Sequence, residues 1–238
     1  MKNTLLITAI AAVFSGQAVA ESAFEGFYTQ IGTGYESNQA DLKNATTIKN
    51  DGKLYGGNQV KDMSNDGVAL ILGAGYNFSI TPKFVLGIGG DWSAFNRTTN
   101  SSTFNCVTSN DSCLKDGSLR TSELATKTSD RYSVFITPSY VIDDEKLVYF
   151  KAGYTGQTVN SIDTRDNNQS VGKANLNGYL LGLGYKQIIT GGLYGFGEGN
   201  WYDYSKSAVH ATTSDGAQHS GNIGGSSYTL TVGVGYKF

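Results

Sequence analysis

The last eleven residues, Tyr228–Phe238, alternate between two kinds of side chain. Every second residue is aromatic or aliphatic, and this set comprises Tyr228, Leu230, Val232, Val234, Tyr236 and Phe238. The residues between them are small or polar, and they are Thr229, Thr231, Gly233, Gly235 and Lys237. Successive side chains of a β-strand point to opposite faces, so one face here suits lipid and the other a crowded, hydrated interior. The chain is therefore predicted to end in a membrane-embedded strand.

The first 20 residues have the three parts of a secretory signal peptide. Lys2 precedes an apolar run, Leu5–Phe14, and the small-residue site Ala18-Val19-Ala20 follows it. A run of about ten residues is too short to cross a bilayer of roughly 30 Å, so a membrane helix is not expected. No cysteine lies near the cleavage site, so a lipid anchor is not expected either. We expect residues 1–20 to be a cleaved signal peptide and residues 21–238 to form one exported domain.

The composition favours sheet over helix, with 31 Gly, 15 Tyr and only 2 Pro. No stretch of the mature chain approaches the roughly 18 consecutive apolar residues of a membrane helix. Only helices and closed barrels satisfy every backbone polar group inside lipid, so a membrane location would require a barrel. The net charge of −2 is spread along the chain, with no run of Lys or Arg to follow phosphates. Nucleic acid is therefore not an expected partner.

The two cysteines, Cys106 and Cys113, lie seven positions apart in a chain that is expected to be exported. An oxidising compartment favours a local disulfide between them over two free thiols. A metal site would need further Cys or His nearby, and the sequence has none there. We therefore predict a disulfide between these cysteines and no metal or cofactor.

Period-two patterns and the gaps between them predict eight strands. They are expected at residues 26–36, 67–78, 83–95, 130–142, 147–158, 177–188, 193–204 and 227–238. The connections alternate without exception between the short turns Ser79–Pro82, Asp143–Lys146 and Thr190–Gly192 and long segments at about 37–66, 96–129, 159–176 and 205–226. This alternation is expected when each hairpin has one end in the periplasm and one outside the cell, with both termini periplasmic.

The predicted fold class is all-β, an eight-stranded antiparallel transmembrane β-barrel with short periplasmic turns and long extracellular loops. A secreted β-sandwich can have a similar strand count. It explains neither the alternation of the connections nor the terminal Phe238.

Parity along the strands assigns a lipid-facing set of residues, in which aromatic side chains gather towards strand ends as interfacial girdles do. The set is Ile31, Thr33, Tyr35, Val68, Leu70, Leu72, Tyr76, Phe78, Phe84, Leu86, Ile88, Trp92, Val134, Ile136, Tyr140, Val148, Phe150, Ala152, Tyr154, Tyr179, Leu181, Leu183 and Tyr185. The strand at 193–204 breaks this pattern, because its aromatic residues are divided between the two parities. Tyr194, Phe196, Tyr202 and Tyr204 share one parity, and Trp201 takes the other. We expect a bulge in this strand and leave its register open.

The opposite faces carry charged residues that must meet one another. An eight-stranded barrel is just wide enough for side chains to fill, and unpaired ions inside it would be costly. Lys151 and Glu198 each lie about five residues from a periplasmic strand start, so they should occupy comparable depths. We predict an internal ion-pair network around them, with Lys186 below and Asp91 and Arg131 nearer the outer rim. The alternative for the rim residues is that they reach water.

Together these features resemble the small eight-stranded outer-membrane barrels, the group that contains the OmpA transmembrane domain, OmpX, the opacity proteins and the porin-family barrel antigens. The resemblance covers residues 21–238. The residues that carry it are Ala18-Val19-Ala20, Gly26-Phe27-Tyr28, Gly73–Tyr76, Gly182–Tyr185 and Val232–Phe238. It implies an assembly signal at Tyr236 and Phe238, with the barrel-assembly machinery as a partner during biogenesis. The chain ends at the barrel, unlike OmpA, so cell-wall tethering is not expected.

The resemblance implies an architecture and not an activity. The first hypothesis is a surface antigen or interaction protein that contacts host molecules, other cells or the envelope through four outer loops. Long connections are usually functional or disordered, and a disulfide in the loop at 96–129 would pre-organise a contact surface. The alternative is that the loops only shield the cell. Outer-membrane lipid and lipopolysaccharide are the expected surroundings, and the oligomeric state is left open.

The second hypothesis is a narrow channel for small solutes or ions, because glycines on the inner faces remove side-chain volume from the lumen. The packing of the lumen argues against it. Tyr28, Phe135 and Tyr149 have inward parity and could fill the space, and the predicted ion pairs would lie across the path.

The third hypothesis is an outer-membrane enzyme that modifies lipid. The only candidate groups are His219-Ser220, with His210 nearby. A hydrolase of this kind needs a carboxylate to orient the histidine, and no Asp or Glu follows Asp215. Solvated loop histidines explain these residues better, so we expect the protein not to be an enzyme.

Overall fold

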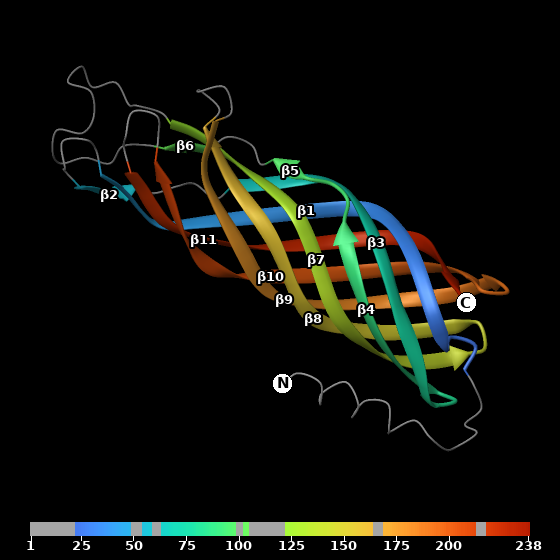
Figure 1. Cartoon of the computed structure of the whole chain (residues 1–238). Helices are drawn as coiled ribbons and strands as arrows, with labels where there is room; N and C mark the ends of the chain where they lie inside the picture. Colours follow the sequence, from blue (N-terminus) through green and yellow to red (C-terminus); the bar gives the residue numbers. More distant parts are fainter. Residues whose placement is uncertain are drawn as a thin grey trace, which may run out of the picture.

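The computed structural model describes residues 22–48, 54–58, 63–98, 102–104, 122–163, 169–212 and 218–238. Their strands form one antiparallel sheet that closes on itself, because β11 pairs with both β10 and β1. Figure 1 shows the resulting barrel. Among the described residues, no helix has the length and apolarity needed to cross a membrane.

Within the described residues, eight long strands form the ring, and each one pairs with its neighbours along the chain. They are β1 (Gly26–Ile48), β3 (Met63–Thr81), β4 (Phe84–Ser93), β7 (Ser122–Asp143), β8 (Lys146–Asp163), β9 (Gln169–Thr190), β10 (Leu193–Thr212) and β11 (Gln218–Lys237). Three short strands add to it, and they are β2 (Leu54–Asn58), which pairs with β1, and β5 (Arg97–Thr98) and β6 (Ser102–Phe104), which pair with β7. The predicted eight-stranded antiparallel barrel is confirmed.

The tight turns lie at one end of the barrel, together with both ends of the described chain. The backbone N–H of Ser22 donates to the hydroxyl of Ser79, and the backbone N–H of Phe238 donates to the carbonyl of Phe27. We call this end the turn end and the opposite end the loop end.

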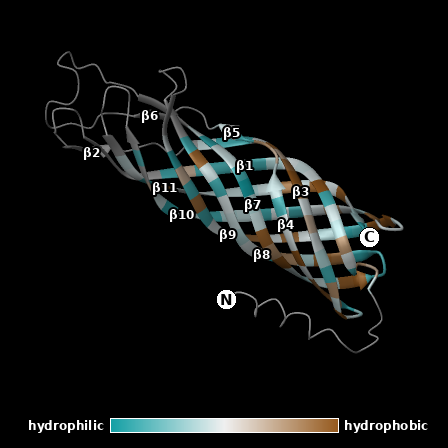
Figure 2. Ribbon diagram, in the orientation of Figure 1, coloured by the Kyte–Doolittle hydropathy of each residue, from teal (hydrophilic) through white to brown (hydrophobic). Residues whose placement is uncertain are grey.

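The outer face of the barrel is apolar, as the parity of the sequence predicts. Phe27 is 66% exposed, Leu183 67% and Val232 64%, although all three are hydrophobic. Aromatic residues form a turn-end girdle of Phe27, Tyr76, Phe78, Phe84, Tyr140, Tyr236 and Phe238 and a loop-end girdle of Tyr35, Trp92, Tyr132, Tyr154, Tyr179, Trp201 and Tyr228. Figure 2 shows hydrophobic residues interspersed along the strands of the half that includes the C-terminus. Such a band with two aromatic edges is the surface that a lipid bilayer covers.

The strands continue past the loop-end girdle, where loops were expected from the sequence. Residues 37–48, 63–66, 122–129, 159–163, 169–176, 205–212 and 218–226 are strand. The prediction of loops is wrong for these residues, and the reason is physical. Beyond the apolar band the outer face of a strand meets water and only some inner residues, such as Leu176 and Ile223, are apolar. The hydrophobic period therefore weakens while the backbone ladder continues.

The strand β10 turns its aromatic face inward. Tyr194, Phe196, Tyr202 and Tyr204 are all buried, whereas Trp201 is exposed. The ladder pairs run without a shift from Tyr194 to Tyr204 on both sides. The predicted bulge therefore does not interrupt the part of the strand that carries the aromatic residues. Register shifts lie at its two ends, beside Leu193 on the β9 side and after Tyr204 on the β11 side.

Above the loop-end girdle the ring divides into two panels. The first panel consists of β10, β11, β1, β2 and β3, and the second of β7, β8 and β9 with β5 and β6. Among the described residues, the last ladder pair between β9 and β10 is Gly178 with Tyr204. The last pair between β3 and β4 on the other side is Ile71 with Ser93. In Figure 1 the β8–β9 hairpin and the β10–β11 hairpin diverge at the end away from the C-terminus.

Candidate functional site

The centre of the lumen is crossed by two ion pairs that share one lysine. Lys151 Nζ of β8 lies 2.8 Å from Asp91 Oδ2 of β4 and 2.9 Å from Glu198 Oε1 of β10. The strands β4 and β10 stand opposite each other in the ring. The Asp91–Lys151–Glu198 bridge therefore spans the barrel, and the structure brings together three of the residues that the sequence assigned to the lumen network.

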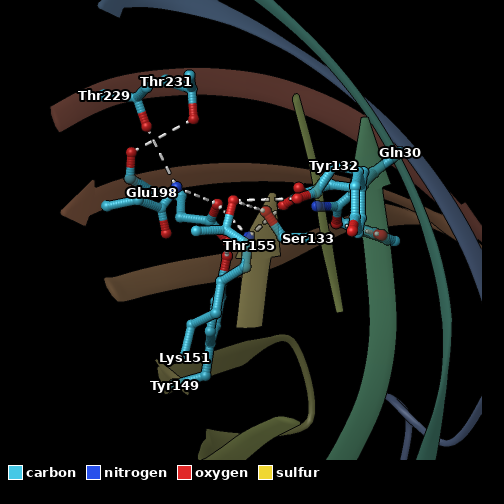
Figure 3. A network of polar contacts seen from close by, with 12 residues as sticks. Gln30, Tyr132, Ser133, Tyr149, Lys151, Thr155, Glu198, Thr229 and Thr231 are labelled. Carbon is cyan, nitrogen blue, oxygen red and sulfur yellow. Dashed lines mark hydrogen bonds and ion pairs between the residues drawn. The ribbon is translucent and has the colours of Figure 1, made fainter. Parts of the chain in front are cut away.

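Neutral side chains add hydrogen bonds to this bridge (Figure 3). The Tyr149 hydroxyl donates to Glu198 Oε2 at 2.6 Å, and Asn200 Nδ2 donates to Glu198 Oε1 at 2.7 Å. The Lys151 ammonium also lies 4.1 Å from the centre of the Phe135 ring. A buried ion pair is stable only when such additional bonds offset its desolvation. The bridge is thus a hydrogen-bonded polar cluster that is held from several strands at once.

A second buried ion pair lies nearer the loop end. Arg131 Nη2 of β7 is 2.9 Å from Glu36 Oε2 of β1, and both side chains are at most 5% exposed. The guanidinium lies 4.7 Å from the centre of the Tyr202 ring, and Asn38 Nδ2 donates to Glu36 Oε1. Arg131 therefore neither reaches water nor pairs with the Asp91–Lys151–Glu198 bridge. The partner choice depends on which strands face each other across the ring, and this cannot be read from parity.

Lys186 lies on the turn-end side of the bridge and contacts rings instead of carboxylates. Its ammonium is 4.1 Å from the centre of the Tyr28 ring, 4.9 Å from that of Tyr194 and 5.4 Å from that of Tyr149. No ion pair joins it to any residue within the described part of the chain. Aromatic faces attract cations by their quadrupoles. The predicted place of Lys186 in the ion-pair network is thus corrected to a tyrosine cage beside that network.

The turn-end mouth is covered by the segment that precedes β1. Phe24 is buried and packs with Val85, Val141 and Leu147. Asn77 Nδ2 donates to the carbonyl of Phe24 at 2.9 Å. Sequence reasoning missed this plug, because a single phenylalanine ahead of a strand carries no pattern.

The glycines of the inner face make sockets for aromatic rings. A Cβ on Gly184 would collide with the Tyr149 ring, and one on Gly235 would collide with the Tyr194 ring. A Cβ on Gly233 would lie 2.6 Å from the Phe196 ring. The missing side chains are therefore replaced by rings from other strands. The glycines do not leave an open path at these levels of the lumen.

Towards the loop end the lumen is apolar. A cluster of buried residues joins the two panels, and it consists of Phe135, Val159, Ala174, Leu176, Leu180, Tyr202, Tyr204 and Ile223. A cavity of about 20 Å³ lies between the panels beside Ala40, Val159, Leu176 and Ile223. This volume holds about one or two water molecules, so it is a packing defect and not a ligand pocket.

The remaining predicted site residues lie apart from the lumen. Tyr236 and Phe238 are exposed on the turn-end girdle, with ring centres 5.2 Å apart. Cys106 and Cys113 lie outside the described residues. The predicted disulfide therefore stays a prediction.

The candidate histidines belong to strands and not to loops. His210 Nδ1 lies 3.4 Å from the hydroxyl of Ser220 on the paired strand, and His210 is exposed. His219 pairs with Ala211 in the same ladder. Among the described residues, no group of three or more metal-binding side chains gathers here or elsewhere.

Two solved structures share this architecture. The outer membrane protein OprG from Pseudomonas aeruginosa matches with a TM-score of 0.61 at 15% identity, over 92% of this chain and 99% of OprG. The outer membrane protease OmpT from Escherichia coli matches with a TM-score of 0.53 at 10% identity, over 93% of this chain and 99% of OmpT. No protein-family model and no curated protein sequence matches the chain. At these identities the likeness establishes the fold, which is that of an outer-membrane β-barrel.

Proposed function

We propose that the protein is an integral outer-membrane barrel of a Gram-negative bacterium, closed in its lumen, that serves as a surface-exposed structural and interaction protein. Adhesion, or contact with host or envelope molecules, would take place at the loop end. The observation that carries the proposal is a contrast within single strands. The Asp91–Lys151–Glu198 bridge crosses the lumen, while two of the strands that hold it, β8 and β10, continue well past the loop-end girdle.

The proposed orientation places the turn end in the periplasm and the loop end outside the cell. Short periplasmic turns and longer outer segments are the rule for barrels of the outer membrane. A signal peptide at residues 1–20 would deliver the chain to the periplasm. Tyr236 and Phe238 would then be presented to the barrel-assembly machinery from the periplasmic side.

The proposed contact surface is the part of the barrel that rises above the loop-end girdle. The strand β8 runs nine residues beyond Tyr154. At about 3.3 Å per residue and a tilt of about 40°, it rises roughly 20 Å above the girdle. Hydrogen-bonded strands hold such a surface in place, so a partner would meet a pre-organised site at a lower entropic cost. Lipopolysaccharide would surround its base.

A channel remains the second hypothesis, and an enzyme the third. The bridge, the tyrosine cage around Lys186 and the Phe24 plug all lie across the lumen, which disfavours a channel. The exposed contact between His210 and Ser220 lacks a carboxylate partner among the described residues, which disfavours a hydrolase.

The first test is single-channel conductance of the refolded protein in a planar lipid bilayer. We expect a silent baseline. Frequent openings of uniform size would overturn the closed barrel and favour the channel.

The second test concerns contact at the loop end. Replacing residues 161–172 by a two-residue Asn-Gly turn joins the paired residues Asn160 and Lys173 directly. Bacteria that display this shortened variant should adhere less to host cells or to one another than bacteria that display the full chain. Equal adhesion at equal surface display would favour simple shielding.

A further inference from the structure

The seam between β9 and β10 leaves two strand edges without a ladder partner among the residues that the structure describes. Within the described part of the chain, β9 pairs only with β8 beyond Gly178, and β10 pairs only with β11 beyond Tyr204. The register shift in β10 between Tyr204 and Ser207 accounts for the separation, because a bulge bends its strand and increases the local twist. The free part of β9, Gln169–Asn177, is longer than an average strand.

The backbone of β9 shows which of its residues face the seam. The N–H of Ile188 donates to the carbonyl of Glu145 at 2.8 Å, on the β8 side. Successive residues of an antiparallel strand direct their polar groups to opposite sides, and β9 pairs with β8 without a shift from Gln187 to Gly172. Odd-numbered residues therefore direct their N–H and C=O towards β10, and above Gly178 these groups face the seam.

The two faces of this edge differ in character. Ala174 and Leu176 are buried in the apolar cluster that joins the panels. Lys173, Asn175 and Asn177 are exposed on the outer face and carry the backbone groups that point into the seam. The free part of the edge contains no proline, so none of its donors is missing.

The opposite seam is bridged. The Asn65 side chain donates to the carbonyl of Thr98, and the backbone N–H of Ala94 donates to the carbonyl of Leu70. These bonds tie β3 to the segment that follows β4. The β9 edge has no such bridge to β10 among the described residues above Gly178.

We propose that the β9 edge at this seam binds an extended segment of another polypeptide by strand addition. Such a segment would pair its backbone with Lys173, Asn175 and Asn177. Its side chains would alternate between small apolar residues above Leu176 and acidic or polar residues beside Lys173. The inference rests on the proposed function, because the edge meets such a partner only if the loop end faces outside the cell.

The test uses a capped peptide as long as the edge, alternating valine and glutamate, and the full-length barrel in lipid nanodiscs. Asn175→Pro removes one donor that faces the seam and leaves the β8 ladder intact. Asn175→Ala is the matched control, because it keeps the backbone donor and removes only the side chain that accepts from Thr158.

We expect saturable binding of the peptide to the wild type and to Asn175→Ala. Binding to Asn175→Pro should be weaker by about tenfold or more, since one hydrogen bond is lost and its neighbours are disturbed. Bound peptide should also slow amide hydrogen exchange at Lys173 and Asn175.

Equal binding to Asn175→Pro, or no binding to the wild type, would overturn the inference. Concentration-dependent self-association that Asn175→Pro abolishes would overturn it too, in favour of a second copy of this chain at the edge. The proposed function fails by different results, namely ion conductance or unchanged adhesion of the shortened variant. Failure of the peptide test alone leaves that function in place.

Discussion

Below the loop-end girdle β9 and β10 form an uninterrupted ladder, and above it each keeps a partner on one side only among the described residues. The same strands thus have two kinds of edge. Inside lipid no water is available for an unpaired N–H or C=O, so an open edge there costs several kcal/mol for each group. Above the apolar band water takes the place of the missing strand. The bilayer therefore dictates where the ring must close, and leaves the loop end free to open.

The interiors of the two parts differ in the same way. The lumen inside the apolar band is filled by the Asp91–Lys151–Glu198 bridge, by rings in glycine sockets and by the Phe24 plug. Between the panels, an apolar cluster holds two separate sheets together. We expect the first part to supply most of the stability and the second to tolerate change. The following predictions test this division.

The largest effect is expected from Lys151→Ala. It leaves Asp91 and Glu198 buried without their cation, which should cost about 3–5 kcal/mol in the free energy of unfolding. The matched control, Lys127→Ala, removes an exposed lysine of the loop end and should cost less than about 0.5 kcal/mol. Urea titration of the refolded barrel in lipid vesicles measures both.

A neutral version of the bridge separates pairing from packing. Lys151→Met combined with Asp91→Asn and Glu198→Gln should lose less stability than Lys151→Ala alone, because no unpaired charge remains. A larger loss from the triple variant would mean that the three residues act independently.

The next prediction compares proline substitutions at two positions of β9, one below and one above the loop-end girdle. Leu183 and Asn175 both direct their backbone N–H towards β10, but only Leu183 has a ladder partner there, Gly199. Leu183→Pro should cost about 3 kcal/mol or more. Asn175→Pro should cost less than about 1 kcal/mol, because its N–H has no ladder partner on β10 among the described residues. Similar losses in urea unfolding would refute the open seam.

A smaller effect on stability is expected from leucine substitutions of two glycines that lie on opposite faces of the barrel wall. Leucine at position 184 would collide with the Tyr149 ring, whose hydroxyl is held by Glu198. Gly184→Leu should cost about 1–3 kcal/mol by overpacking. Gly197 has no other side chain near its outward face, so Gly197→Leu should be tolerated. Heat-modifiability on gels and urea unfolding report both, and a failure of Gly197→Leu to fold would contradict the assignment of faces.

Much of this fold could be predicted from the sequence, because lipid imposes a period of two on the apolar band. All eight strands and the facing of residues such as Ile31 and Leu181 follow from that period. The strand β10 resisted prediction, since its rings fill glycine sockets on other strands and its lipid face is mostly glycine. The aromatic residues of β10 therefore mostly mark the inner face, whereas those of the neighbouring strands mostly mark the lipid face.

Contacts inside the lumen could be predicted only where the depth of two residues along their strands was enough to show that they meet. Lys151 and Glu198 lie at similar depths on strands two apart, and they meet. The parity of its strand places Glu36 on the inner face, but its pairing with Arg131 depends on the stagger of the closed ring. The strand extensions that form the two panels were not predicted, because their outer faces meet water and only some inner residues are apolar. The hydrophobic period is therefore weak there, although the backbone hydrogen bonds continue.

The smallest effect on stability is expected from breaking the Lys146–Asp143 ion pair, whose N–O distance equals that of Lys151 and Glu198 in the lumen. Lys146 Nζ lies 2.9 Å from Asp143 Oδ2 in the turn between β7 and β8, where both side chains are well exposed. The hydrogen bond from Lys146, with that from the backbone of Glu145, holds the pKa of the Asp143 carboxyl below its usual value. A carboxyl whose pKa is depressed by folding stabilises the protein above its unfolded pKa, and this stability is lost as the pH falls through the folded pKa.

The difference in stability between the wild type and Asp143→Asn should therefore be small near neutral pH. It should begin to fall at about pH 4 and vanish once the pH lies below the lowered folded pKa of Asp143. High salt should reduce it as well, since exposed pairs are screened. Urea unfolding across this pH range measures it. An effect as large as that of Lys151→Ala would show that distance alone sets the strength of these pairs. The contrast expected here would instead attribute the difference in strength between the two pairs to their surroundings. Lys151 and Glu198 are buried, so water cannot hydrate one of them when the other is removed, whereas Lys146 and Asp143 are exposed to water.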